Sequence, residues 1–69
     1  MRISARNSIK GTIVTITKGM VNAEVVLDIG NGILVTSMIT AHAVDSLGLK
    51  EGIQAFAVIK SSEVTIAVD

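Results

Sequence analysis

The sequence contains no cysteine, proline, tryptophan or tyrosine, and it has one phenylalanine and one histidine. Without cysteine, no disulfide can cross-link the chain, and a single histidine is too few for a structural zinc site. The residue sets of a hydrolase triad, a metal cluster and a phosphate-binding Walker loop are likewise missing. We therefore expect a protein that is not an enzyme, carries no cofactor and coordinates no metal ion directly.

An excess of charge of one sign is also missing, since six basic and six acidic residues give a net charge of +0. No basic patch and almost no aromatic residue are available for nucleic-acid binding. No run approaches the about 20 apolar residues that a membrane-spanning helix needs. Arg2 is followed by polar residues and not by the apolar stretch of a signal peptide. We expect a cytoplasmic protein with neither nucleic acid nor membrane as partner.

Apolar residues, in contrast, are abundant. They make up 49% of the 69 residues, and the mean hydropathy is +0.65. A chain this short buries only about 60% of the surface that its unfolded form exposes, so its own core is marginal. The surplus of apolar surface predicts an interface between subunits.

The order of apolar residues predicts strands. Valine and isoleucine, which favour pleated surfaces, outnumber leucine. Residues 9–17 and 21–29 are expected to pair as an antiparallel hairpin, with Gly19 supplying a positive φ in the turn. In residues 21–29, apolar side chains occupy every second position from Val21 onward, which indicates one buried face. The Gly-Asn-Gly turn at 30–32 then leads to a third strand at 34–38.

The pattern changes at Thr40. This residue is a good N-cap, helical spacing follows it, and Gly48 stands where a glycine ends a helix. Residues 53–60, apolar on both faces, predict a fourth strand covered on both sides, and residues 64–68 predict a fifth. The fold class is therefore mostly β: a small five-stranded OB-like barrel with one short helix between strands 3 and 4, in a single domain of residues 1–69.

Three groups of hydrogen-bond donors could hold an anion. Ser4 and Arg6 are two residues apart on the predicted start of the first strand, so their side chains would point the same way. Lys60 and Ser61 end the fourth strand, and Thr40 opens a helix whose first N–H groups lack partners. The ordinary alternatives are solvated strand ends and a plain helix cap, and the pattern alone does not choose between them.

Three segments carry a family resemblance. The opening ISARNSIKGTI, the central TSMIT with the following AVDSLGLKEG, and the closing AVIKSSEVTIAVD together resemble the molbindins. These are small molybdate-binding proteins built from a single Mop-type, TOBE-like domain. The resemblance covers essentially the whole chain, with the segments in the same order and at the same spacing.

The resemblance implies a homo-hexamer, a trimer of dimers, whose oxyanion sites lie between subunits. Where some relatives have a serine, this chain has Ala43, so a backbone N–H is the donor expected there. A second class of sites near symmetry axes is placed at the predicted hairpin turn and at the histidine, that is at Gly19, Val21, Asn22 and His42. The main site implied by the resemblance consists of Ser4, Arg6, Thr40, Ala43, Lys60 and Ser61.

A pocket composed only of donors suits molybdate, which is a fully deprotonated dianion at neutral pH, whereas monohydrogen phosphate needs an acceptor for its own proton. Tungstate is nearly the same size and is expected to bind equally well. The sequence thus predicts a protein that stores molybdate or tungstate for molybdenum homeostasis. The alternative is a structural or regulatory module that binds a protein partner, with any anion incidental.

Overall fold

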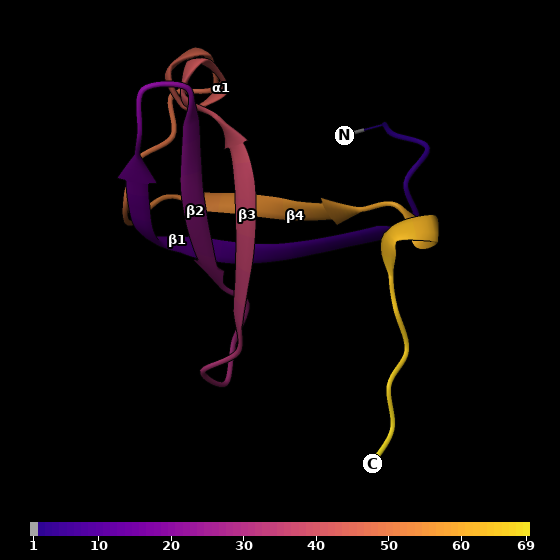
Figure 1. The fold of residues 1–69 in the computed structure, drawn as a ribbon. Coiled ribbons are helices and arrows are strands. Elements are labelled where there is room, and N and C mark those ends of the chain that lie inside the picture. Colours follow the sequence, from indigo (N-terminus) through magenta and orange to yellow (C-terminus); the bar gives the residue numbers. More distant parts are fainter. Residues whose placement is uncertain (1) are drawn as a thin grey trace.

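The computed structural model describes residues 2–69 as a curled, four-stranded antiparallel sheet with one short helix (Figure 1). The sheet order is β3-β2-β1-β4. The predicted mostly-β class and the position of the helix between the third and fourth strands are confirmed. The elements in chain order are β1 (Asn7–Lys18), β2 (Asn22–Asp28), β3 (Leu34–Thr40), α1 (Ala41–Ser46), β4 (Gln54–Ile59) and the 3-10 turn η1 (Ser61–Glu63).

β1 is the longest strand and pairs with two neighbours. Its first half pairs with β4 from Asn7 to Thr12, and its second half pairs with β2 from Thr12 to Lys18. Between Ile13 and Thr15 the register shifts, as it does at a β-bulge. Beyond this shift, the backbone N–H of Ile16 donates to Glu51 Oε2 at 3.1 Å. The bend at the bulge turns the β1–β4 pair away from β2 and β3, which gives the sheet its curl (Figure 1).

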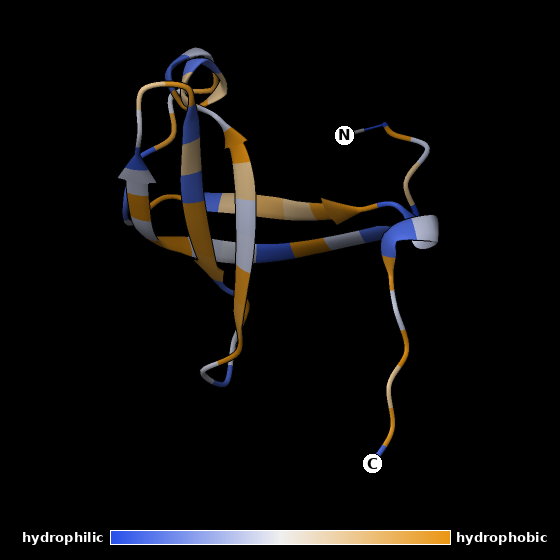
Figure 2. Ribbon diagram, viewed as in Figure 1, coloured by the Kyte–Doolittle hydropathy of each residue, from blue (hydrophilic) through white to orange (hydrophobic). Residues whose placement is uncertain are grey.

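The core lies on the inner face of the curl, under α1. In β2, the predicted alternation is confirmed over Ala23, Val25 and Leu27, which are almost fully buried. Val21 is different, because it precedes the strand and is 72% exposed. Figure 2 shows the apolar positions distributed along all four strands. The buried apolar side chains of the described chain are Ile13, Ala23, Val25, Leu27, Ala41 and Val44.

Two turns test the predicted roles of glycine. The Gly-Asn-Gly turn between β2 and β3 has positive φ at all three residues, including 56° at Asn31, as expected. Gly19 does not adopt a positive φ, so that prediction is wrong. Its N–H instead donates to the carbonyl oxygen of Asn22 at 2.8 Å, and an added Cβ would lie 3.0 Å from that oxygen. Close approach of backbone, and not backbone conformation, explains a glycine at this position.

The helix α1 begins and ends as predicted. Thr40 is its N-cap, and the chain leaves it through Gly48 at a φ of 65°. The amide of Leu49 donates to the carbonyl of Val44 at 3.0 Å after this reversal. Val44 and Ala41 attach the helix to the core.

Three strand predictions are corrected. Ser4 and Arg6 precede β1, which begins at Asn7, so the two-residue period of a strand does not fix their side-chain directions. β4 is not covered on both sides, because Phe56 and Val58 are exposed. Residues 64–68 form no strand and make a separate, extended tail after η1 (Figure 1). The sheet therefore has four strands and not five, because the tail has no strand beside it within the described chain.

Replacing Ile13 by alanine is expected to destabilise the fold by about 2 to 5 kcal/mol, since it leaves a cavity where a side chain is only 1% exposed. Val14→Ala is the matched control, because Val14 is adjacent and 40% exposed, and a loss below about 1 kcal/mol is expected there. Urea unfolding at equal protomer concentration measures both values. Equal losses for the two variants would contradict the assigned core.

Candidate functional site

The N-terminal segment and the end of β4 lie together at one end of the molecule. Asn7 pairs with Ile59, and the Asn7 side-chain amide donates to the Ile59 carbonyl at 3.3 Å. Because the two strands are antiparallel, Arg6, just before β1, and Lys60, just after β4, both lie directly beyond this pair. Two of the three predicted donor groups, Ser4 with Arg6 and Lys60 with Ser61, are therefore brought to the same end.

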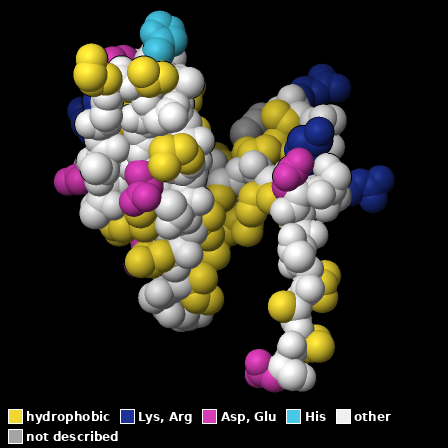
Figure 3. All heavy atoms as spheres, in the orientation of Figure 1, with side chains coloured by type: hydrophobic (Ala, Val, Ile, Leu, Met, Phe, Trp, Pro, Cys, Tyr) yellow, Lys and Arg dark blue, Asp and Glu magenta, His cyan; other side chains and the backbone are white. Residues whose placement is uncertain are grey.

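This end is rich in cations. Figure 3 shows Lys and Arg side chains gathered where the N-terminal segment meets η1. Arg6 and Lys60 are exposed, and within residues 2–69 neither forms an ion pair. Glu63 in η1 contributes one carboxylate to the same end. The arrangement leaves two cationic side chains and the nearby hydroxyls of Ser4 and Ser61 able to donate to an anion.

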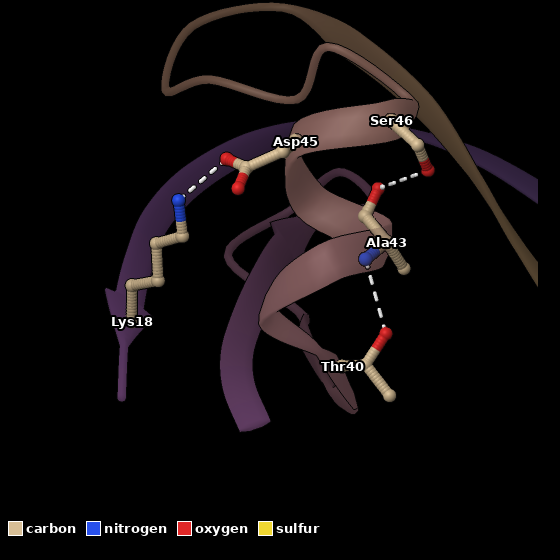
Figure 4. Close-up of polar contacts among 5 residues, drawn as sticks. All are labelled: Lys18, Thr40, Ala43, Asp45 and Ser46. Carbon is tan, nitrogen blue, oxygen red and sulfur yellow. Dashed lines mark hydrogen bonds and ion pairs between the residues drawn. The ribbon is translucent and has the colours of Figure 1, made fainter. Parts of the chain in front are cut away.

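The third predicted group, at the start of α1, is organised as a helix cap (Figure 4). Thr40 Oγ1 accepts from the Ala43 N–H at 3.0 Å, so the Ala43 donor is engaged in the cap in this structure. The Ala41 N–H donates to the Val21 carbonyl at 2.7 Å. Among the first three helical amides of the described chain, this leaves the His42 N–H without a partner. The Thr40 hydroxyl accepts in the cap and keeps its own proton to donate.

The cap and the cationic end are at opposite ends of one long strand. Lys18, the last residue of β1, donates to Asp45 of α1, whereas Asn7, its first residue, pairs with the end of β4. Figure 1 shows α1 and η1 correspondingly far apart across the fold. One chain therefore brings together two of the three predicted donor groups and holds the third away from them.

The residues predicted for a second class of sites lie beside the helix cap. Gly19 and Asn22 close the turn between β1 and β2, and Asn22 pairs with Thr40 across β2 and β3. Val21 accepts from the first amide of α1, and His42 is exposed on its first turn. These four residues and the cap thus form one continuous surface.

Sequence reasoning did not identify the contact that fixes this surface. Lys18 donates to Asp45 across 27 positions in sequence, which ties the end of β1 to α1 (Figure 4). Within the helix, Ser46 Oγ donates to the Ala43 carbonyl at 3.4 Å. An ion pair between a strand end and a helix has no local sequence signal, because it depends on the tertiary approach of the two elements.

Other kinds of site find little support in the structure. Among residues 2–69, no three His, Asp or Glu side chains come together as a metal site would require. No helix in this part of the chain is long and apolar enough to cross a membrane. An open hollow of about 580 Å³ beside Lys10, Val14, Asp28 and Ile29 contains none of the predicted site residues.

Comparison with known proteins agrees with the motifs. The TOBE domain family matches residues 3–66. Molybdenum-pterin-binding protein 3 of Clostridium pasteurianum is 53% identical over 66 residues, which cover 96% of this chain and 97% of that protein. MopII from the same organism superposes with a TM-score of 0.91 at 49% identity, covering 97% of this chain and all of that one.

A third similar protein has been solved with its ligand. The cytoplasmic molybdate-binding protein ModG, crystallised with molybdate bound, superposes with a TM-score of 0.83 at 54% identity. The match covers 88% of this chain and 43% of ModG. The relatives are described as binding proteins and not as enzymes. The chain therefore belongs to the TOBE domain family, within the molybdate-binding molbindin group that its motifs resemble.

Proposed function

We propose that this protein binds molybdate, and equally tungstate, between subunits of a homo-hexamer and stores it for molybdenum homeostasis in the cytoplasm, without catalysis. One domain of residues 1–69 is the repeating unit, a trimer of dimers is the assembly, and neither nucleic acid nor membrane is a partner. The observation that carries the proposal is the separation of the donor groups. Arg6 and Lys60 lie at one end of β1 and Thr40 at the other, so a site that uses all three needs a second copy.

The chemistry of the two ends supports an oxyanion as ligand. The cationic end offers Arg6 and Lys60, each able to make a charge-assisted hydrogen bond worth about 1.5 to 3 kcal/mol. The cap end offers the Thr40 hydroxyl and the free His42 N–H. The hydroxyls of Ser4 and Ser61 are the neutral donors proposed at the cationic end, where η1 also places the carboxylate of Glu63.

The Ala43 N–H takes part in the proposed site in one of two ways. It keeps its bond to Thr40 Oγ1 and stabilises the cap, or the threonine side chain turns toward the anion and releases that N–H as a further donor. Both arrangements leave Thr40 as the residue through which α1 contacts the anion. We place the second class of sites on the adjoining surface formed by Gly19, Val21, Asn22 and His42.

Exposed apolar side chains support self-association. Large hydrophobic residues are exposed on β1, β3 and β4 and in both terminal segments, which is more than a small monomer normally leaves in water. With no disulfide and a small core, contact between copies is the available source of further stability. The residues concerned include Ile3, Met20, Val21, Leu34, Met38, Leu47, Phe56, Val58 and Ile66.

The same apolar surface also fits the second candidate function, a module that binds a different protein. The two proposals differ in what covers that surface. A homo-hexamer covers it with copies of this chain, whereas an interaction module keeps it for a partner of another sequence.

Isothermal titration with molybdate, combined with native mass determination of the same sample, tests the proposal. We expect tight binding of molybdate and tungstate to a hexamer, with sulfate and phosphate weak or silent. A correctly assembled protein that gives no heat with any oxyanion would overturn the binding proposal. A stable complex with another protein in place of the hexamer would favour the interaction module.

Arg6→Ala is expected to weaken molybdate binding about 10- to 150-fold, which is the loss of one charge-assisted hydrogen bond. Folding is expected to be unchanged, because the Arg6 side chain is exposed and makes no ion pair within residues 2–69. Arg2→Ala, in the same segment, is the matched control and is expected to bind normally. Unchanged affinity of the Arg6 variant by titration calorimetry would remove Arg6 from the site.

The substitution Thr40→Asp distinguishes the capping role of Thr40 from its proposed contact with the anion. Aspartate is a good N-cap, so the free energy of unfolding is expected to change by less than about 1 kcal/mol. Its negative charge repels an oxyanion, so molybdate affinity is expected to fall at least about tenfold. Thr40→Ser, which keeps both the cap and the hydroxyl, serves as control. Normal molybdate affinity of the aspartate variant would place the anion away from α1.

A further inference from the structure

The turn between β2 and β3 lies at the end of this hairpin that is far from α1 (Figure 1). Gly30, Asn31 and Gly32 form the turn, and all three are exposed. The Ile33 N–H donates to the Gly30 carbonyl at 3.0 Å, and φ is 56° at Asn31 and 74° at Gly32. Positive φ at both central residues is the pattern of a type I′ turn, in which Asn-Gly is a preferred pair. Turn geometry thus explains the pair, and the same pair has a reactivity of its own.

Both groups that would react are unbonded in this turn. Within residues 2–69, neither the Asn31 side-chain amide nor the Gly32 N–H forms a hydrogen bond. Apart from its chain neighbours, no heavy atom lies within 4 Å of the position that a Cβ on Gly32 would occupy. The Asn31 side chain can therefore approach the following backbone nitrogen without displacing another part of the molecule.

The reaction available to this pair is deamidation, since asparagine is among the thermally labile residues. The Gly32 nitrogen loses its proton to solvent and attacks Asn31 Cγ, which forms a Cγ–N bond and closes a succinimide ring. The bond from Cγ to the side-chain nitrogen breaks, and that nitrogen takes up a proton and leaves as ammonia. Water then opens the ring at either carbonyl, giving aspartate or isoaspartate. Water is the only co-reactant, and nothing is oxidised or reduced.

The two other asparagines of the chain lie within paired strands. Asn7 pairs with β4, and its side-chain amide donates to the Ile59 carbonyl at 3.3 Å. Asn22 is followed by Ala23, which is 1% exposed and has strand partners in both β1 and β3. At either position, the side chain can reach the next nitrogen only after strands separate.

Opening the β2–β3 turn costs less than separating strands. Ring closure requires the Asn31 backbone to leave its left-handed conformation, because that conformation turns the next nitrogen away from the side chain. Two backbone hydrogen bonds close the turn, from the Ile33 N–H to the Gly30 carbonyl and from the Ile29 N–H to the Ile33 carbonyl, at 3.0 and 2.9 Å. Opening of an exposed turn belongs to the low end of local stability. Asn31 is thus the asparagine with the easiest access to the reactive geometry.

We infer that the β2–β3 turn is a modification site, at which Asn31 deamidates without an enzyme and ahead of Asn7 and Asn22. The aspartate product keeps the turn, because aspartate, like asparagine, tolerates a left-handed conformation. The isoaspartate product routes the main chain through the side-chain carbon. This lengthens the turn, so the two hydrogen bonds that close it are not both kept.

Either product adds one negative charge to a chain whose net charge is +0. In an assembly of identical copies the added charge is repeated in every copy, which opposes both association and the approach of an anion. The turn contains none of the residues proposed to bind molybdate. The inference therefore goes beyond the proposed function and does not rest on it: failure to bind molybdate leaves it intact, and an unmodified turn leaves the storage proposal intact.

Peptide mapping of aged protein tests the site. The folded parent protein is kept for several weeks in neutral buffer at physiological temperature, digested under mildly acidic conditions and sequenced by mass spectrometry beside a fresh sample. We expect conversion of amide to acid mainly at Asn31, together with methyl incorporation by an isoaspartate-specific methyltransferase. Asn31→Gln is the matched control, because its longer side chain closes a ring much more slowly, and it is expected to incorporate no methyl groups. No conversion at Asn31, or equal conversion at Asn7 or Asn22, would overturn the inference.

Hydrogen exchange tests the effect of each product on the turn. The Asn31→Asp protein supplies the aspartate form, and the isoaspartate form is separated from the aged parent by ion exchange. The Ile29 and Ile33 amides are expected to exchange as slowly in Asn31→Asp as in the parent, and faster in the isoaspartate form. Equally slow exchange in all three proteins would overturn the assigned lengthening of the turn.

Discussion

The backbone pairing of β1 is the interaction on which the rest of the structure depends. β1 alone joins the two halves of the sheet, because its first half pairs with β4 and its second half with β2. Thr12 belongs to both ladders, and the register shift that follows bends the strand. Beyond the bend, Glu51 accepts from the Ile16 amide. The curl and the separation of the two donor ends both follow from this one strand.

The small core sets a second constraint. Within residues 2–69, six apolar side chains are buried, and they belong to β1, β2 and α1, whereas β4 contributes none. Half of β1 and all of β4 are therefore held mainly by backbone pairing, with one face of β4 open to water. A strand pair of this kind is marginally stable alone. Contact between copies would supply the burial that the single chain lacks, which links stability and ligand binding to the same surfaces.

Local signals made part of this structure predictable from sequence. The threonine cap and Gly48 bound α1, and the Gly-Asn-Gly turn requires left-handed backbone, so both elements were predicted correctly. Residues 64–68 alternate as a strand does, but a strand exists only beside a partner, and within residues 2–69 no strand lies beside the tail. Lys18 and Asp45 are 27 positions apart, and the separation of Arg6 from Thr40 depends on the tertiary course of β1. The ion pair and this separation depend on how distant segments are arranged in the fold, and short residue patterns carry no information about that arrangement.

The division of donors between two ends of one chain has a consequence for release of the anion. In the proposed arrangement, an oxyanion held between copies binds the assembled protein and not the separate chains, so binding and assembly are linked by mass action. Abundant molybdate then favours the assembled state, and dilution of the protein weakens its hold on the anion without any change in an individual chain. The amount of anion that can be held would thus depend on the cellular concentration of the protein. The apparent affinity for the anion would rise and fall with that same concentration.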